Sequence, residues 1–440
     1  MTLLRYFSVA SAVFAGLLTA TAHTSLDDIR ATPEKAGGVY YAYPNMEGVA
    51  TTPAPKGYKP FYVSHYGRHG SRYLISDNDY KYVMDIMAKA ETSGKLTPLG
   101  KDVKARLDTV WLEAEGRGGE LSPLGVRQHH GIAQRLYKNY PQIFQGKPEI
   151  TASSTTVMRC AHSMFSFIEG LKELNPGLVI PRESGNRNMY FLNYHDPKTG
   201  WKSSHTGPWY QDWKKFRAEK SNPDRLMKTL FNDSLYVRRN VDPVETMWGL
   251  YWVAVDMQNM ETPISFMDIF TTEELYDLWQ VFNFNFYSCN SSYPPADGAF
   301  VDNAKNLVRN ILDNANDYIM NGKNGATLRF GHDGNIIPLT ALLNIEGCYA
   351  DVTDPYKLAG TYSDYQISPM AANLQLIFFK NKGGDVLVKI LLNEQEVKIP
   401  VETDIFPFYH WEDLKIYLSD TVLGQPYGMI QAKRMSNDDK

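Results

Sequence analysis

The sequence contains little cysteine, with three residues among 440: Cys160, Cys289 and Cys348. Their spacing does not resemble a metal site, and we expect neither a metal nor a cofactor. In an exported protein two of the three could form a disulfide and leave one thiol free, and the sequence does not select the pair.

Neither sign of charge dominates the chain, because 45 Lys and Arg face 49 Asp and Glu, a formal net charge of -4. A general affinity for nucleic acid is therefore not expected. If the substrate is an anion, positive charge has to be concentrated in one cleft. Hydrophobic residues make up 43% and charged residues 21%, as in ordinary globular proteins, and 28 Tyr and 8 Trp provide for a core and an aromatic-lined cleft.

Long hydrophobic runs are absent except near the start, where residues 1–22 have the pattern of a secretory signal peptide. Arg5 is the positive residue, Ser8–Leu18 is apolar, and Ala20-Thr21-Ala22 fits a cleavage site before His23. The apolar stretch is too short for a membrane anchor, and no cysteine follows it that could carry a lipid. We therefore expect a periplasmic or secreted protein that has no membrane association once the signal is removed.

The stretch from Phe61 to Tyr73 reads Phe-Tyr-Val-Ser-His-Tyr-Gly-Arg-His-Gly-Ser-Arg-Tyr. Its apolar beginning predicts a buried strand, and Gly67 and Gly70 predict a tight loop after it. Arg68 and Arg72 offer planar guanidinium groups that match phosphate oxygens, and His69 between them could accept a phosphoryl group on a ring nitrogen. Most short basic clusters are solvated surface or ion pairs, so this loop alone does not decide the function.

Two further segments have the same form, a strand followed by a turn with Arg or His and then a helix. The strand Glu149–Ser153 leads to Arg159, and the strand Ala326–Phe330 leads to His332 and Asp333. Taken alone, Arg159 is more often a structural salt bridge. Because ligands of open α/β sheets bind at the carboxyl ends of the strands, the three turns could meet in one cleft.

The combined set of side chains suits phosphoryl transfer, which needs charge stabilisation and an in-line nucleophile. In this interpretation neutral His69 attacks phosphorus, protonated Asp333 donates a proton to the leaving alcohol, and water then cleaves the phosphohistidine. The remaining candidates bind the phosphate group: Arg68, Arg72, Arg159 and His332.

These motifs resemble those of the histidine acid phosphatases. Arg68-His69-Gly70-Ser71-Arg72 matches the signature Arg-His-Gly-x-Arg, and His332-Asp333 matches the later His-Asp pair that carries the proton donor. The flanks Tyr62–Tyr73 and Leu121–Gly125 are similar to the multiple inositol polyphosphate phosphatase branch. That branch usually has His-Ala-Glu at the donor site, whereas this chain has His332-Asp333-Gly334, the pattern of the His-Asp phytases and acid phosphatases.

The resemblance implies an α/β fold, in which a large domain has a central mixed sheet flanked by helices and a smaller α-helical cap domain is inserted into it. A change of composition near residue 175, where strand signals fade and tryptophans gather, agrees with this. We place the large domain at 23–174 and 301–440 and the cap at 175–300. Basic cap residues are candidates for outer phosphates, although each alone is more often on a solvated helix face: Lys202, Lys214, Lys215 and Arg217.

Several elements are expected within this frame. Residues 23–60 contain five prolines and are expected to be loop-rich and to wrap the surface. Thr97 and Ser122 are expected to cap helices that begin at Pro98 and Pro123. The remaining expectations are helices at Tyr80–Ala90, Pro243–Met260, after Thr271, Asp297–Asn316, Leu339–Ile345 and Trp411–Leu418, and strands at Leu374–Phe379, Val386–Leu392 and Val397–Val401.

The leading hypothesis is an exported phosphomonoesterase that hydrolyses inositol polyphosphates such as phytate. A broad-specificity acid phosphatase or sugar-phosphate phosphatase is the alternative within the same class. A mutase is disfavoured by the export signal, and a non-catalytic phosphate-binding protein is disfavoured because all the proposed catalytic residues are present. We expect a monomer whose partner is a small phosphorylated molecule.

Overall fold

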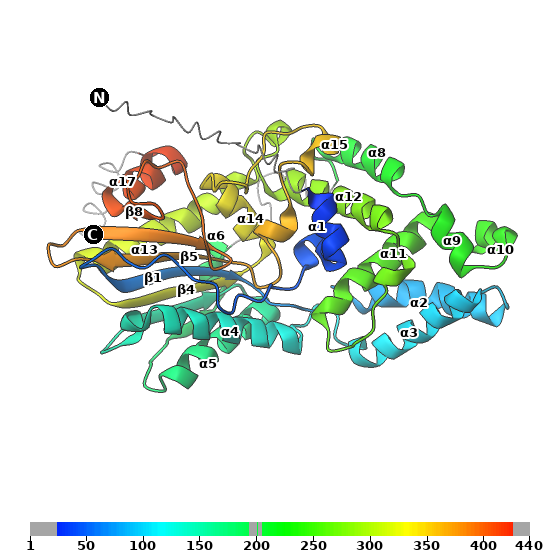
Figure 1. Ribbon diagram of the computed structural model, residues 1–440, viewed down its shortest axis with the longest axis horizontal. Helices are drawn as coiled ribbons and strands as arrows, with labels where there is room; N and C mark the ends of the chain where they lie inside the picture. Colours follow the sequence, from blue (N-terminus) through cyan, green and yellow to red (C-terminus); the bar gives the residue numbers. More distant parts are fainter. Residues whose placement is uncertain (1–23, 193–199, 201–204, 426–440) are drawn as a thin grey trace, which may run out of the picture.

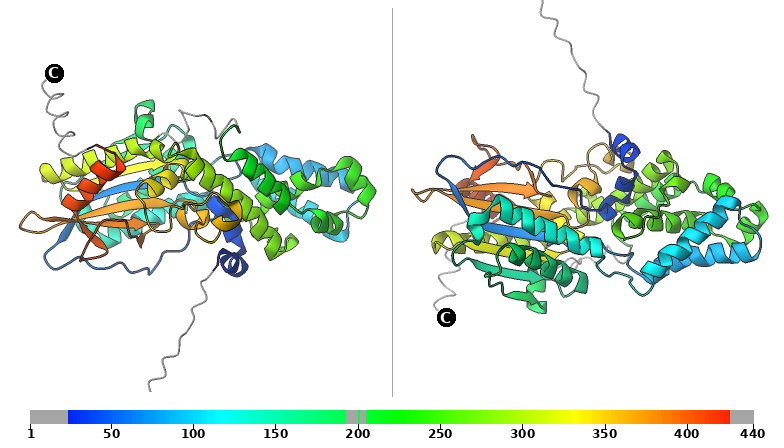
Figure 2. Two further views of the ribbon diagram at one scale, coloured as in Figure 1. Left: turned by 90° about the horizontal axis from the view of Figure 1, so that it is seen from above. Right: turned by 60° about the horizontal axis from the view of Figure 1, so that its bottom comes forward.

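The computed structural model of the protein describes residues 24–192, 200 and 205–425. The predicted signal peptide and the candidate Lys202 lie outside these residues. A central β-sheet has helices on both faces, and a further group of helices extends to one side of it (Figures 1 and 2).

The sheet is mixed, as predicted. Its order is β3-β2-β4-β1-β5-β6-β7, and β8 pairs with β6. The four strands β3, β2, β4 and β1 run parallel, while β5 to β8 are joined by antiparallel pairings. The bounds are β1 Lys59–Arg68, β2 Glu149–Ser154, β3 Arg182–Ser184, β4 Gly325–Gly331, β5 Asn373–Lys380, β6 Val386–Leu392, β7 Gln395–Glu396 and β8 Phe408–His410.

The register of the parallel strands brings their carboxyl ends to one edge of the sheet. In β1 and β4, Arg68 lies opposite Gly331, and in β2 and β4, Ser154 lies opposite Phe330. The three turns that the sequence singled out therefore leave the sheet at the same edge, as expected for a ligand site of an α/β fold.

Alternating side chains of β1 divide the core into two layers, because successive residues of a strand point to opposite faces. Val63 packs with α4 (Pro123–Asn139) and α5 (Met158–Leu174). Tyr62 packs in the other layer and stacks on Tyr318 of α13 (Lys305–Met320), with ring centroids 4.0 Å apart. Figure 1 shows these two sets of helices on opposite faces.

Helix capping follows the sequence closely. The Ser122 hydroxyl accepts a hydrogen bond from the Gly125 N–H at the start of α4, and Thr97 does the same for Gly100 in α3 (Pro98–Ala114). Thr271 and Glu274 form the predicted capping box of α12 (Thr272–Asn290). The starts of these helices could be predicted from the sequence because the oxygen atoms of capping side chains accept hydrogen bonds from the first N–H groups of a helix.

The group of helices beside the sheet draws on two parts of the chain (Figure 1). Helix α2 (Asp77–Thr92) packs on α3 and on α11 (Pro243–Asp256), and α3 packs on α9 (Asp224–Leu230). Strand β3, conversely, lies within the segment predicted as a cap but extends the main sheet. The domain limits at 175 and 300 stay a prediction.

Residues 23–60 are loop-rich over 41–58, but they also contain two helical segments that the sequence did not indicate, α1 (Ser25–Ala31) and the 3-10 helix η1 (Pro33–Tyr40), whose Ala36 and Val39 are buried. Two expectations about other segments are wrong. The expected strand Val397–Val401 does not form, and α13 begins only at Lys305, after the 3-10 helix η7 (Val301–Ala304).

All three cysteines are buried, and among the described residues no disulfide joins any two of them. Among the described residues no helix has both the length and the apolar character needed to cross a membrane. The remaining short elements are η2 Pro141–Phe144, η3 Asn186–Asn188, α6 Met189–Leu192, α8 Tyr210–Lys220, α10 Ser234–Asn240, η4 Met257–Asn259, η5 Met267–Ile269, η6 Pro294–Ala296, α14 Asp333–Leu342, α15 Pro355–Leu358, α16 Asp364–Ile367, α17 Trp411–Ile416 and the π-helix η8 Tyr417–Val422.

Two buried histidines behind the β1 loop make stability depend on acidity. His65 packs on Phe167 and Phe330 with ring centroids 4.7 and 5.5 Å apart, and His129 packs on Phe330 at 5.7 Å. Burial lowers the pKa of each to about 3, since a charged imidazole would lose its hydration there. In the unfolded chain each protonates near its ordinary value of 6.5.

Each of these histidines should therefore contribute full stability above pH 6.5 and progressively less as the pH falls toward 3. Between pH 6.5 and 4.5 each is expected to lower the free energy of unfolding by about 2 kcal/mol. We predict that His129→Phe removes about half of this loss, measured by urea unfolding at both pH values. His162→Gln, at an exposed position, is the control and should leave the loss unchanged; an equal loss in His129→Phe would contradict the account.

Candidate active site

The loop after β1 is held against the start of α4 by close backbone contact. A Cβ on Gly70 would lie 2.6 Å from the Gly125 carbonyl oxygen, and one on Gly125 would lie 2.3 Å from the Ser71 carbonyl oxygen. The Ser122 N–H donates to the Ser71 carbonyl at 2.9 Å. The two glycines explain why the sequence Leu121–Gly125 accompanies the Arg-His-Gly loop: only glycine lets the helix approach the loop this closely.

His69 lies at the carboxyl edge of the sheet, and its side chain is buried. Its backbone N–H donates to the Gly331 carbonyl at 2.9 Å, and its Nδ1 lies 3.0 Å from the Gly70 carbonyl oxygen. Since a carbonyl oxygen can only accept, Nδ1 carries the proton and the lone pair is on Nε2. Burial, followed by the positive charges of Arg159 and Arg68, holds the pKa of His69 well below its ordinary value of 6.5.

Two arginines line the cavity beside His69. Arg72 is buried, its Nη1 donates to the Tyr73 carbonyl at 2.8 Å, and its guanidinium lies 4.6 Å from the ring centroid of Tyr40. Arg159 is the second residue of α5, so its side chain lies at a helix N-terminus, where the backbone also favours an anion.

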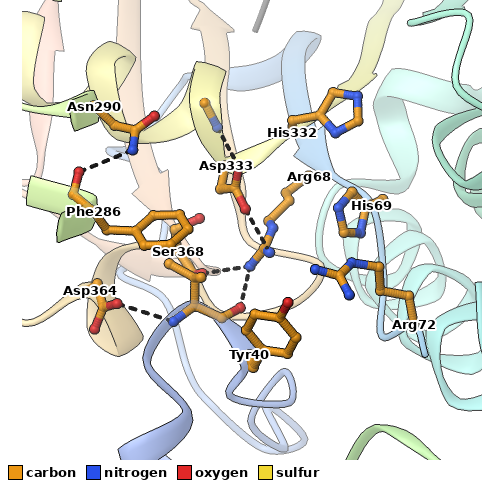
Figure 3. A network of polar contacts seen from close by, with 12 residues as sticks. Tyr40, Arg68, His69, Arg72, Phe286, Asn290, His332, Asp333, Asp364 and Ser368 are labelled. Atoms are coloured by element: carbon orange, nitrogen blue, oxygen red, sulfur yellow. Dashed lines mark hydrogen bonds and ion pairs between the residues drawn. The ribbon is translucent and has the colours of Figure 1, made fainter. Parts of the chain in front are cut away.

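Arg68 lies behind the cavity and has a different environment from the other arginines. It is 0% exposed, and its Nη1 donates to the carbonyl oxygens of Val39 at 2.5 Å and Ser368 at 2.8 Å. Its Nη2 forms an ion pair with Asp333 Oδ2 at 2.8 Å. Figure 3 shows Arg68 at the centre of this network, pointing toward the Asp333 carboxylate. Direct contact of Arg68 with a phosphate stays a prediction.

Asp333 is the first residue of α14, directly after β4 and His332. Its side chain is 24% exposed, and its Oδ1 accepts from the Gly334 N–H at 2.7 Å. Both this bond and the Arg68 ion pair favour the charged carboxylate. Arg68 therefore fixes the position of the carboxylate that faces the cavity.

His332 lies beside His69, with ring centroids 5.5 Å apart. Its Nε2 is 3.2 Å from the Thr155 hydroxyl, and its backbone N–H donates to the Tyr66 hydroxyl at 2.9 Å. Thr155 follows β2 and Tyr66 belongs to β1. Residues of β1, β4 and the turn after β2 thus hold His332 in place.

One cavity of about 470 Å³ joins the sequence-predicted residues. Five of the six candidates line it, and Arg68 supports Asp333 from behind: His69, Arg72, Arg159, His332 and Asp333. The Nε atom of Arg72, which lines the cavity, is buried and has no hydrogen-bond partner among the described residues. Buried N–H donors of this kind are expected to be paired, so an anion at the site would supply an acceptor.

Two other basic side chains near the strand ends, Arg329 and His65, do not line this cavity. Arg329 is buried but bonds Asn310 Oδ1 at 2.7 Å and Ser64 Oγ at 3.0 Å, and His65 packs among aromatic rings. Among the described residues no group of three or more His, Cys, Asp or Glu side chains could hold a metal ion.

Sequence reasoning missed the part that η1 plays. Tyr40, its last residue, lines the cavity, and the Val39 carbonyl binds Arg68. The Val39 N–H donates to buried Asp364 at 3.2 Å, and burial raises the pKa of this carboxyl to about 6. Gly38 has φ +54°, and a Cβ there would lie 2.4 Å from Asp364. The pair Gly37-Gly38 is therefore the one feature of the sequence that could have indicated a close backbone contact in this segment.

A second missed group links the loop to α11 and η4. Asn259 Oδ1 accepts from the Ser71 hydroxyl at 2.7 Å, and its Nδ2 donates to the Tyr40 carbonyl at 2.9 Å. Asp256 accepts from the Tyr80 hydroxyl at 2.6 Å, and burial raises its pKa to about 7. Nothing in the local sequence marks these residues, because their partners are far away along the chain.

The arrangement can bind a phosphate group between guanidinium groups and present a neutral imidazole nitrogen to phosphorus, with a carboxyl nearby. Those are the parts of a phosphatase site that uses histidine as the nucleophile. The family model of the histidine phosphatase superfamily (branch 2) matches residues 67–393. The chain belongs to this superfamily branch, and it is an enzyme of the histidine acid phosphatase type.

Solved structures share the fold. The multiple inositol polyphosphate phosphatase of Bifidobacterium longum, in complex with inositol hexasulfate, superposes with a TM-score of 0.69 at 21% identity, covering 90% of this chain and 99% of that one. The phytase of D. castellii gives 0.67 at 16% identity (89% and 86%), and the apo Hafnia alvei phytase gives 0.52 at 13% (84% and 98%). A search of curated protein sequences finds no significant match.

Proposed function

We propose that the protein is an exported phosphomonoesterase that works through a phosphohistidine on His69. The observation that carries the proposal is the state of this imidazole: it is buried, its Nδ1 faces a carbonyl oxygen, and its pKa is held low by burial and by neighbouring arginines. A neutral imidazole with Nε2 unprotonated at mildly acidic pH is the form that can attack phosphorus.

In the first step the Nε2 lone pair of His69 forms a bond to phosphorus while the ester P–O bond breaks. Arg72 and Arg159, with His332 beside them, stabilise the charge on the phosphoryl oxygens. The leaving oxygen takes the proton of Asp333. Asp333 has to be protonated for this step, and the negative charge of a bound phosphate beside it favours that form against the opposing effect of Arg68.

In the second step water attacks the phosphohistidine. Its proton returns to Asp333, the N–P bond breaks, and inorganic phosphate leaves with His69 neutral again. The enzyme therefore needs no metal and no cofactor for turnover, because its own side chains supply the nucleophile, the charge and the proton.

Inositol polyphosphates are the substrates that we propose first. The support is the family membership together with the fold shared with a multiple inositol polyphosphate phosphatase and with phytases. The second candidate, a broad-specificity acid phosphatase, is favoured by the described lining of the cavity. Among the described residues that line the cavity the only arginines are Arg72 and Arg159, and four of the others are aromatic: Tyr40, Trp252, Phe282 and Phe286. Such a lining provides positive charge for one phosphate group and apolar surface for the rest of the substrate.

A direct comparison of substrates distinguishes these candidates. Phytate, glucose 1-phosphate and a chromogenic monoester are assayed side by side at pH 4.5 to 7, with phosphate release as the common readout. We expect hydrolysis of all three without added metal, and kcat/KM highest for phytate. If phytate is the poorest substrate, the inositol polyphosphate assignment is wrong and the broad phosphatase remains; if none is hydrolysed, the proposed function fails.

A further inference from the structure

A second cavity shares an aromatic wall with the catalytic cavity. The second cavity, here called the annex, has a volume of about 700 Å³ and lies between α8, α11 and α12. Trp252 and Phe282 line both cavities. The annex is otherwise lined mainly by rings and apolar side chains: Tyr210, Trp213, Trp248, Val244, Val281 and Ala218.

A continuous row of aromatic rings joins the two cavities. Arg72 lies over Tyr40, whose ring is 5.8 Å from that of Trp252, and Trp252 is 5.7 Å from Trp248. Phe282 stands at 79° to Trp252, with centroids 4.9 Å apart. The row therefore begins at an arginine of the phosphate site and ends in the annex.

The cations of the annex do not make it a phosphate site. Arg217 lies over Trp248 at 5.1 Å and forms an ion pair with Glu245 at 2.8 Å, so its charge is balanced within the annex. Lys214 is exposed at its margin. Apart from exposed Lys214, the described lining offers additional phosphates only Arg217, whose charge Glu245 already balances. Phosphates placed against this wall would therefore lose hydration with little compensation.

We propose that the annex and the shared wall bind a planar aromatic ring in the leaving group of a phosphate monoester. This rests on the proposed phosphohistidine chemistry and adds a substrate class to it, with the phosphate at His69 and the ring past Trp252 in the annex, between Trp213 and Trp248. Aromatic rings stack on Trp with little dependence on the identity of the ring, because every such ring presents a π-face. Nucleoside monophosphates and other ring-bearing monoesters are members of this class.

The test uses two substrates that differ only in the ring. Adenosine 5′-monophosphate and ribose 5-phosphate carry the same primary alkyl phosphate, and only the first has a base. We expect wild type to prefer the nucleotide by about 10-fold or more in kcat/KM. The preference should lie in KM, since stacking far from the reacting atoms binds ground state and transition state alike.

Trp213→Leu is the variant, because Trp213 lines the annex but not the catalytic cavity. It should reduce the preference ratio several-fold through KM for the nucleotide. Trp111→Leu, at another partly buried tryptophan outside both cavities, is the matched control and should keep the wild-type ratio.

The outcomes distinguish failure of the annex proposal from failure of the proposed phosphatase function. If both substrates are hydrolysed with equal kcat/KM, or if Trp213→Leu keeps the full preference, the annex proposal is wrong and the phosphatase assignment stands. If wild type releases phosphate from neither of these substrates, nor from phytate or a chromogenic monoester, the proposed function fails and the annex proposal with it.

Discussion

His69→Ala should lower phosphate release from every substrate by at least about 10⁴-fold, since the variant loses the only nucleophile that the mechanism uses. No other described histidine is placed to act as the nucleophile in its stead. The His332 ring is 5.5 Å away between centroids, and its Nε2 is engaged with the Thr155 hydroxyl. Initial rates with phytate and with a chromogenic monoester measure the effect.

The same variant should still bind inorganic phosphate, because Arg72 and Arg159 are unchanged. Titration calorimetry with phosphate separates loss of chemistry from loss of the binding site. The exposed His162 provides the matched control, and His162→Ala should keep wild-type turnover. Turnover of His69→Ala within 10-fold of wild type would contradict the mechanism.

Asp333→Asn is expected to have the second largest effect, and the size should depend on the leaving group. General acid catalysis contributes about 10²- to 10⁴-fold when the leaving oxygen needs a proton. A primary alkyl phosphate should lose activity in this range, whereas a nitrophenyl ester should lose much less, because its phenolate leaves without a proton. The asparagine retains an oxygen that can accept from Arg68, so the substitution changes the proton donor more than the geometry.

The leaving-group comparison also contains its own control, because both esters are measured on one variant preparation. If Asp333→Asn loses activity equally on the alkyl and the aryl ester, Asp333 is not the proton donor. In that case the ion pair with Arg68 at 2.8 Å would make Asp333 a positioning residue for the arginine.

The parts of the site that follow strands could be predicted from the sequence. Arg68, His69, Arg159 and His332 each lie at or soon after the end of a strand that the sequence predicted, and parallel strands bring such turns to one edge. The caps of α3, α4 and α12 were predictable for a related reason, since each depends on residues three apart. Local patterns of this kind were enough to predict the strands of the sheet, the edge at which the site lies and the reacting side chains.

The parts that depend on long-range contacts could not be predicted. Tyr40 and Val39 reach the site only because η1 folds back over the loop, where Asp364 holds it. A proline-rich segment gives no periodic signal for such a fold. The composition predicted an aromatic-lined cleft but could not say which rings form it; the rings are Tyr40, Trp252, Phe282 and Phe286. It also could not show that Arg217, a candidate for outer phosphates, pairs with Glu245.

The central claim is that a phosphoryl group is carried on His69 during turnover. The most direct measurement is to quench the enzyme in alkali while it hydrolyses a chromogenic monoester and to locate the modification by peptide mass spectrometry. The account predicts one phosphoryl group on His69, absent from His69→Ala and absent without substrate. Turnover with no phosphorylated peptide, or with the phosphoryl group on a different residue, would contradict it.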